Sequence, residues 1–299
     1  MKQLIVVLGP TAVGKTACAI RLAQTFQTEI LSFDSRQFYR ELDIGVARPS
    51  PDELAAATHH FIANRSVLQP YNVYDYEHEA LDLLQQLFQH HDVAIAVGGS
   101  GLYADALCNG INRMPDPTPE LRASLAARIA EGQLDQLLDE LRQLDPDYYA
   151  VVDRRNPIRI QRALEVIYTS GHTFSSHLHQ PLPERPFAIT KVALRADPPI
   201  LRERIDRRVD LMMEQGLMDE VRALLPLRHL NTLNTVGYKE LFAHLDGQST
   251  LPDAVKAIKH NTWRYAKKQI TWLKRYPEIF WTEKENFSQL LQFLREKLY

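Results

Sequence analysis

Apolar residues in the first third of the chain form short runs that alternate with helical patterns. Three runs predict buried strands: Leu4–Leu8, Glu29–Phe33 and Val93–Val97. Residues 75–90 repeat their apolar positions with the helical period, and shorter helices are expected up to Phe26 and over residues 52–57. Strands that alternate with helices through short loops predict an α/β fold with a parallel, doubly wound sheet.

The pattern changes after residue 109. Prolines interrupt the chain at 115–119 and again at 181–186, and the residues between them show helical patterns alone. Ile189–Leu194 then predicts another strand, and the rest of the chain reads as mainly helical. We therefore expect an α/β core of residues 1–109 and 186–299, interrupted by a helical insertion at residues 110–185.

A glycine-rich sequence joins the first strand to the first helix. It reads G-x-x-x-x-G-K-T and comprises Gly9, Pro10, Thr11, Ala12, Val13, Gly14, Lys15 and Thr16. This strand–loop–helix arrangement aims backbone N–H groups and a helix N-terminus at phosphate oxygens. The loop therefore predicts a site for a phosphate or diphosphate, although a turn that only packs remains the alternative.

Two further strand ends carry polar residues. Ligands bind beyond the carboxyl ends of strands in such sheets, so the glycine loop, Asp34 and the Gly98–Gly101 turn are expected to border one crevice. We expect Asp34 one strand over from the loop. Its carboxylate can hold Mg²⁺, act as a general base, accept hydrogen bonds from an adenine-type amine, or merely cap a helix. The Gly98–Gly101 turn has no acid, which weakens a phosphoryl-transfer interpretation.

The formal net charge of −2 conceals a local basic block. Residues 254–277 contain seven Lys or Arg and no acid, so this stretch is +7 and the remainder is −2 − 7 = −9. Such a block indicates a polyanionic partner, whereas a merely solvated helix face usually mixes signs. A helix here would bury Val255, Ile258, Ile270 and Leu273, and Trp263, Tyr265 and Trp272 would either stack on bases or join the core.

Arginines cluster at two other places. Arg204, Arg207 and Arg208 have helical spacing and can clamp a departing diphosphate, unless Glu203 and Asp206 neutralise them in a salt-bridged surface helix. Residues 154–162 of the insertion carry four more arginines, so two positive lobes can close around RNA.

The remaining composition excludes several classes of protein. Two cysteines give no disulfide framework, the histidines lack metal-ligand spacing, and no stretch approaches the length of a membrane span. We therefore expect a cytoplasmic protein without a membrane partner.

Taken together, the motifs resemble those of bacterial tRNA dimethylallyltransferases (tRNA isopentenyltransferases). They follow the order of that family over nearly the whole chain: Gly9–Thr16, Asp34–Tyr39, Asp43–Gly45, Val97–Tyr103, Arg162–Val166, Val236–Glu240 and Lys267–Lys274. The chain departs from the usual pattern at Ser100, Val46 and Arg48, where the family has Thr, Thr and Lys.

The resemblance implies a P-loop fold and transfer of a dimethylallyl group from dimethylallyl diphosphate to N6 of adenosine 37 in tRNA. It implies Mg²⁺ as cofactor, with Thr16 as a ligand, the tRNA anticodon stem-loop as partner, and a monomer. Asp34 would be the general base, Ser100 would lie beside the reacting atoms, Arg208 would support the diphosphate, and the glycine loop would hold it. The tRNA would contact Asp34, Ser35, Arg36, Gln37, Ser100, Arg122, Ile158, Arg159, Ile160, Gln161, Arg162, Asn234, Thr235, Val236, Gly237, Tyr238, Lys239, Lys267, Lys268, Gln269, Ile270, Thr271, Trp272, Leu273 and Lys274.

Three alternatives stay open at this point. The first is a small-molecule P-loop kinase that binds ATP, the second is an isopentenyltransferase for free adenine nucleotides, and the third is a non-catalytic nucleic-acid-binding NTPase. The basic block and the large insertion argue against the first two, because a free nucleotide needs neither.

Overall fold

A computed structural model describes residues 1–298, and the chain divides into two compact units. The sheet unit comprises Met1–Cys108 and the chain from Arg185 onward, and the helical unit comprises Asn109–Glu184. No helix among the described residues is both long and apolar enough to cross a membrane.

The sheet unit is built on six parallel strands in the order β3-β2-β4-β1-β5-β6. The strands are β1 (Gln3–Leu8), β2 (Ile30–Ser32), β3 (His59–His60), β4 (Val93–Val97), β5 (Ala188–Arg195) and β6 (Phe280–Glu283). The predicted parallel sheet is therefore confirmed. The two edge strands were not predictable, because β3 has two residues and β6 has four, too few for a clear period of apolar positions.

One expectation about this sheet is wrong. Asp34 was expected one strand over from the glycine loop, but β4 lies between β1 and β2. The register pairs Leu4 with Ala94 and Ile30 with Ile95, so β4 is hydrogen-bonded on both sides. Because the small residues Gly98 and Gly99 follow β4, the loop after β1 and Asp34 after β2 still border one crevice across its end.

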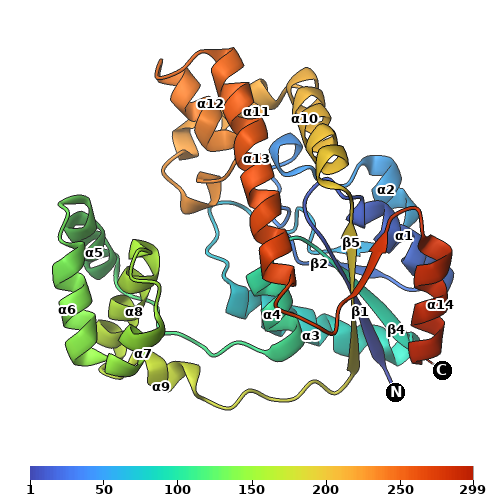
Figure 1. Cartoon of the computed structure of the whole chain (residues 1–299), viewed down its shortest axis with the longest axis horizontal. Coiled ribbons are helices and arrows are strands. Elements are labelled where there is room, and N and C mark those ends of the chain that lie inside the picture. Colours follow the sequence, from blue (N-terminus) through green and yellow to red (C-terminus); the bar gives the residue numbers. More distant parts are fainter. Residues whose placement is uncertain (299) are drawn as a thin grey trace. The chain divides into compact units, whose positions relative to one another are not determined.

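Helices cover both faces of the sheet (Figure 1). The α-helices of this unit are α1 (Lys15–Phe26), α2 (Pro51–Ala56), α3 (Val73–His90), α4 (Gly101–Asn109), α10 (Pro198–Glu214), α11 (Leu217–Ala223), α12 (Tyr238–Leu245), α13 (Leu251–Leu273) and α14 (Phe287–Leu298). Alternate residues of β1 enter opposite cores: Leu4 and Val6 pack with α3 and α4, and Ile5 and Val7 pack with α1 and α14. Each fully buried aliphatic side chain contributes about 1.5–3 kcal/mol.

The helical unit has a core of its own. Its helices are α5 (Pro119–Ala130), α6 (Leu134–Leu144), α7 (Pro146–Val151), α8 (Pro157–Ser170) and α9 (Phe174–Leu178). Leu125, Leu137, Leu141 and Ile160 are almost fully buried together. The sequence marks the helix starts, because α5, α7 and α8 each have a Thr, Asp or Asn cap followed by proline.

Candidate active site

The glycine loop leads from the end of β1 into α1. Gly14 is the residue before the helix, adopts a left-handed conformation with φ 102°, and places no side chain over the first-turn N–H groups of α1. Those groups are therefore available to an anion. Lys15 reaches back along the loop and donates a hydrogen bond to the carbonyl of Pro10 at 2.9 Å. Burial lowers the pKa of Lys15 to about 8, and nearby Asp34 raises it while Arg208 lowers it.

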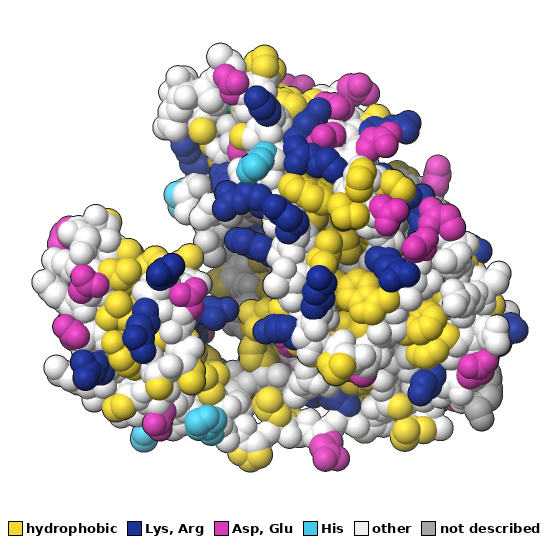
Figure 2. All heavy atoms as spheres, in the orientation of Figure 1, with side chains coloured by type: hydrophobic (Ala, Val, Ile, Leu, Met, Phe, Trp, Pro, Cys, Tyr) yellow, Lys and Arg dark blue, Asp and Glu magenta, His cyan; other side chains and the backbone are white. Residues whose placement is uncertain are grey.

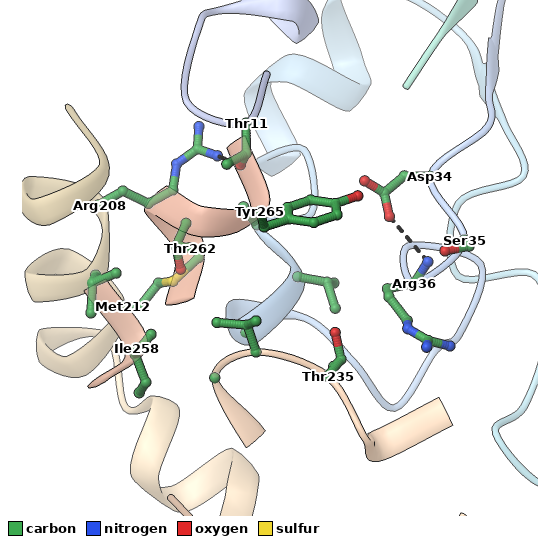
Figure 3. A pocket seen from close by; sticks show the side chains of 16 residues that line it. Thr11, Asp34, Ser35, Arg36, Arg208, Met212, Thr235, Ile258, Thr262 and Tyr265 are labelled. Carbon is green, nitrogen blue, oxygen red and sulfur yellow. Dashed lines mark hydrogen bonds between the residues drawn. The ribbon is translucent and has the colours of Figure 1, made fainter. Parts of the chain in front are cut away.

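Arg208 brings a second cation from α10 to the same loop. Its Nη1 donates to the Thr11 hydroxyl at 3.3 Å, and Figure 3 shows the guanidinium pointing at Thr11. Burial lowers the pKa of Arg208, against the effects of Glu53 and Asp34. Of the three arginines with helical spacing, only Arg208 contacts the loop. Arg207 is exposed, and Arg204 forms an ion pair with Glu285 at 3.4 Å.

Asp34 follows β2 and begins a tight turn. Its Oδ1 accepts a hydrogen bond from the Arg36 backbone N–H at 3.0 Å, so the carboxylate does stabilise local structure. Residues 35–38 form a turn and no helix follows directly. Ser100 holds this turn from the end of β4, because its hydroxyl accepts from the Ser35 N–H at 3.0 Å and donates to the Ser35 hydroxyl at 3.1 Å.

Two adjoining crevices, one polar and one with mixed lining, meet beside the glycine loop and Asp34. They share five lining residues: Thr11, Asp34, Val46, Ala47 and Arg208. The polar crevice is further lined by Lys15, Thr16, Ser32, Arg48, Glu53 and His59. The mixed crevice has a largely apolar wall of Val209, Met212, Val236 and Ile258, together with Tyr265 (Figure 3). An anionic group and an apolar group attached to it can therefore lie side by side, with Asp34 at their junction.

Tyr265 projects from α13 into the mixed crevice, and Figure 3 shows its hydroxyl pointing toward Asp34. The hydroxyl donates to the carbonyl of Gly99 at 3.3 Å. Desolvation of the hydroxyl inside the crevice, with the nearby Asp34 carboxylate, raises the pKa of Tyr265, so the hydroxyl stays a neutral donor at physiological pH although the residue as a whole is partly exposed.

Gln269 ties α13 to both loops. Its Oε1 accepts the Thr11 backbone N–H at 2.8 Å, and its Nε2 donates to the carbonyl of Gly99 at 2.8 Å. Gly99 leaves no room for a side chain, since an added Cβ would lie 2.5 Å from the Gln269 Nε2. Gln269 was predicted to contact tRNA, but the side chain is buried against these loops.

The outer face of α13 is basic. Figure 2 shows Lys and Arg side chains along this helix. The exposed ones are Lys256, Arg264, Lys267 and Lys268, followed by Lys274 and Arg275 just after its last turn. The predicted apolar stripe lies inward, with Ile258 and Leu273 buried and Val255 and Ile270 half-buried. Trp263 and Trp272 pack against the cores, whereas Tyr265 is 41% exposed.

The other residues predicted to contact tRNA divide by exposure. In the helical unit, Arg122 and Arg162 both approach Glu165, at 3.5 and 3.4 Å, whereas Ile160 is buried. Ile158 is 76% exposed and Arg159 is exposed beside it, an apolar and a cationic side chain on one surface.

In the sheet unit, Asn234 and Lys239 are exposed. Thr235, Val236 and Gly237 line the mixed crevice, and Tyr238 is fully buried.

Sequence reasoning missed several crevice residues, including Glu53, His59 and Met212. None stands in a recognisable motif with the loop, so only the folded sheet brings them there. Arg48, which stands where the family has Lys, also lines the polar crevice. The described residues contain no cluster of three or more His, Cys, Asp or Glu that can hold a metal.

The parallel sheet and its glycine loop with two cations define a P-loop α/β protein. The acid at the junction of the polar and the mixed crevice gives it a group-transfer site.

The chain belongs to the IPP transferase family, which is the family of the tRNA dimethylallyltransferases. The family model matches residues 37–276. It is 49% identical to tRNA dimethylallyltransferase 1 of Bacteroides thetaiotaomicron over 99% of this chain and 96% of that protein. It is 47% identical to tRNA dimethylallyltransferase of Christiangramia forsetii over 99% of this chain and 98% of that one.

Two solved structures match all or nearly all of the chain. The crystal structure of tRNA isopentenylpyrophosphate transferase from Bacillus halodurans matches with a TM-score of 0.72 and 31% identity, covering 100% of this chain and 97% of that one. A eukaryotic dimethylallyltransferase described as acting on tRNA matches with a TM-score of 0.79 and 25% identity, covering 97% of this chain and 75% of that one.

Proposed function

We propose that this protein transfers the dimethylallyl group of dimethylallyl diphosphate to N6 of adenosine 37 in tRNA and releases diphosphate. The observation that carries the proposal is the position of Asp34, which lines both the polar crevice of the glycine loop and the mixed crevice beside it. The donor has the same two halves, an anionic diphosphate and a small apolar chain. The kinase and free-nucleotide alternatives are not favoured, because the relatives are named for tRNA.

The diphosphate binds at the glycine loop in this proposal. Lys15, Arg208 and the free N–H groups at the start of α1 face the oxygens that gain charge as the C–O bond breaks. The allylic carbon tolerates the positive charge that forms on it as the C–O bond breaks. Stabilising the negative charge on the departing diphosphate is therefore the larger task. The apolar wall of Val209, Met212 and Ile258 then encloses the five-carbon group.

The family is metal-dependent, and we propose Mg²⁺ as the ion. Thr16 lines the polar crevice beside Lys15, and the described residues offer no three-acid cage. This donor set fits Mg²⁺, which is commonly held by one or two protein oxygens, substrate phosphates and water. When bound, the ion neutralises charge on the departing diphosphate.

Asp34 accepts the proton of the adenine amine as N6 forms its bond to the allylic carbon. The amine is a poor nucleophile because its lone pair is delocalised into the ring, so removal of this proton favours bond formation. Ser100 keeps the Asp34 turn in place through Ser35, and the Tyr265 hydroxyl lies beside it. The target base must leave its stack to reach the crevice, which makes base flipping the mode of entry.

The anticodon stem-loop binds along basic surfaces of both units. In the sheet unit these are the exposed lysines of α13 with Asn234 and Lys239, and in the helical unit Arg122 and Arg159. The protein acts as a monomer, and the cytoplasm is the expected compartment.

One experiment tests the proposal. The protein is incubated with unmodified tRNA, dimethylallyl diphosphate and Mg²⁺, and the digested tRNA is examined by mass spectrometry. The expected result is one prenyl mass on an adenosine next to the anticodon, with one diphosphate released for each transfer. ATP hydrolysis without modified adenosine would contradict the proposal.

A further inference from the structure

A short turn forms one wall of both crevices. It comprises Asp43–Ala47 and contains a single 3₁₀ turn at Ile44–Val46. Val46 and Ala47 line both crevices, and Gly45 lines the mixed one. Ala47 has a φ of 49°, a left-handed conformation that costs a residue with a side chain about 1 kcal/mol. Contacts from elsewhere must therefore hold the turn in this shape.

Glu220 of α11 supplies those contacts. Its Oε2 accepts the backbone N–H groups of Asp43 at 3.3 Å and of Ile44 at 2.8 Å, and its Oε1 accepts that of Gly45 at 3.1 Å. One carboxylate thus binds three consecutive amides of the turn, and hydrogen bonds to an ionised acceptor are stronger than neutral ones.

Tyr238 of α12 orients that carboxylate. The Tyr238 hydroxyl donates to the Glu220 Oε1 at 2.5 Å, and the ring is fully buried. Burial and the neighbouring Glu220 raise the pKa of Tyr238, so the hydroxyl keeps its proton. The ring also packs against Gly45, where an added Cβ would lie 2.6 Å from the Tyr238 ring.

The carbonyl side of the turn is tied to the Asp34 segment. The Gln37 Nε2 donates to the carbonyls of Val46 at 3.2 Å and Ala47 at 2.9 Å. Gln37 belongs to the turn that Asp34 begins, since its own N–H donates to the Asp34 carbonyl at 3.2 Å. The Asp43–Ala47 turn is therefore hydrogen-bonded to Glu220 through its amides and to the Asp34 turn through its carbonyls.

We propose that Glu220 is a positioning residue for the transfer reaction. Oriented by the Tyr238 hydroxyl, it fixes the Asp43–Ala47 turn and thereby sets the distance between the Val46 wall and the Asp34 carboxylate. Glu220 does not line either crevice, so it acts through the turn. The inference rests on the proposed function for its kinetic consequence, although the fixing of the turn is independent of it.

Glu220→Gln tests the inference. An amide nitrogen cannot accept hydrogen bonds, so at least one pair of the four bonds is broken while size and shape are kept. We expect kcat/KM for dimethylallyl diphosphate to fall at least tenfold, with a raised KM for this donor and an unchanged Kd for tRNA. Hydrogen exchange of the peptide that covers residues 40–49 should accelerate at least tenfold. Glu214→Gln on the exposed face of α10 is the matched control and should change neither quantity.

Tyr238→Phe keeps the buried ring and removes only the hydroxyl, so it serves if Glu220→Gln does not fold. We expect about a threefold loss of kcat/KM, and the two substitutions together should cost less than the product of the single effects. A kcat/KM within twofold of wild type in the folded variants, or unchanged exchange of residues 40–49, would overturn the inference. If the wild-type protein itself does not modify tRNA, the proposed function fails, and the exchange rates still decide whether Glu220 fixes the turn.

Discussion

The Arg208 guanidinium lies 3.3 Å from the Thr11 hydroxyl, although 197 residues separate them in sequence. Arg207, its neighbour on α10, is exposed and lines neither the polar nor the mixed crevice. Arg208→Ala should therefore lower kcat about 10²–10³-fold, as for the loss of one preorganised donor to a developing anion. Arg207→Ala is the matched control and should stay within twofold. Steady-state rates with saturating tRNA measure both, and equal losses would mean that general surface charge is responsible.

Asp34 is expected to act as the base. Asp34→Asn keeps an oxygen that can accept the Arg36 N–H but removes the group that takes the proton, so kcat should fall about 10²–10⁴-fold. Affinity for tRNA, measured by filter binding, should stay within threefold. A variant with a nearly normal rate would reduce Asp34 to a residue that stabilises its turn.

Lys15 predicts a pH dependence of diphosphate binding. Its pKa is about 8 in the free protein, and only the protonated side chain adds a positive charge that attracts the diphosphate. Affinity for inorganic diphosphate should therefore fall as pH rises above 8, by up to about tenfold per unit. Calorimetry with EDTA present, at pH 7 to 10, measures this. Because diphosphate also titrates, Lys15→Met provides the comparison, and a parallel pH profile for that variant would contradict the prediction.

The same group has the opposite effect on stability. The pKa of Lys15 lies below the ordinary 10.5, so between pH 8 and 10.5 the unfolded chain binds more protons than the folded protein. This contribution makes the free energy of unfolding rise with pH across that window, whereas below pH 8 both states are protonated and the contribution is constant. Urea denaturation of wild type and Lys15→Met separates it from other groups.

The basic face of α13 predicts a salt-dependent interaction with tRNA. Lys267→Glu with Lys268→Glu should weaken tRNA binding, and the slope of log K against log salt should become shallower by about one for each lysine that no longer neutralises a phosphate. Binding measured between about 50 and 200 mM salt gives the slope. Unchanged affinity would assign these lysines to an ordinary solvated surface.

Arg185 forms a buried ion pair with Glu77, and the two side chains are 6% and 5% exposed. Arg185 also donates to the carbonyls of Ala106 and Leu107 in the last turn of α4, at 2.6 and 3.0 Å. Arg185→Ala leaves a carboxylate buried without its partner and should cost about 3–5 kcal/mol of unfolding free energy. Arg202→Ala, which breaks a more exposed pair with Asp206, should cost at most about 1 kcal/mol in the same urea experiment.

Much of the architecture was predictable because it depends on local patterns. The apolar runs at β1 and β4 and the caps of α5, α7 and α8 are complete within a few residues. The order of strands was not predictable, since β4 inserts between β1 and β2 through tertiary pairing. A two-residue strand such as β3 has no period of its own and exists because β2 pairs with it.

The candidate site divides in the same way. The glycine loop and Asp34 stand at strand ends, where sequence already indicates a ligand site. Spacing alone does not distinguish Arg208 from Arg207, and only the family resemblance favoured Arg208. In the structure Arg208 faces Thr11 and Arg207 is exposed. The family motif Lys267–Lys274 assigns Gln269 to tRNA, and only the folded chain shows that this side chain also binds the Thr11 amide and the Gly99 carbonyl. Glu220 had no signal in the sequence, because the three backbone amides that it binds lie 175 to 177 residues away.

The hydrogen bond from the Thr11 amide to Gln269 spans 258 residues. The loop is among the first segments synthesised, yet the group that binds its amide emerges only near the end of translation. The pairing of β1, the strand before the loop, is also incomplete until late in translation, since one of its neighbours is β5 at Ala188–Arg195. A product that ends before α13 therefore contains every residue of the glycine loop and still lacks a finished phosphate site. Premature termination at that point of the message should be as damaging to activity as loss of the loop itself.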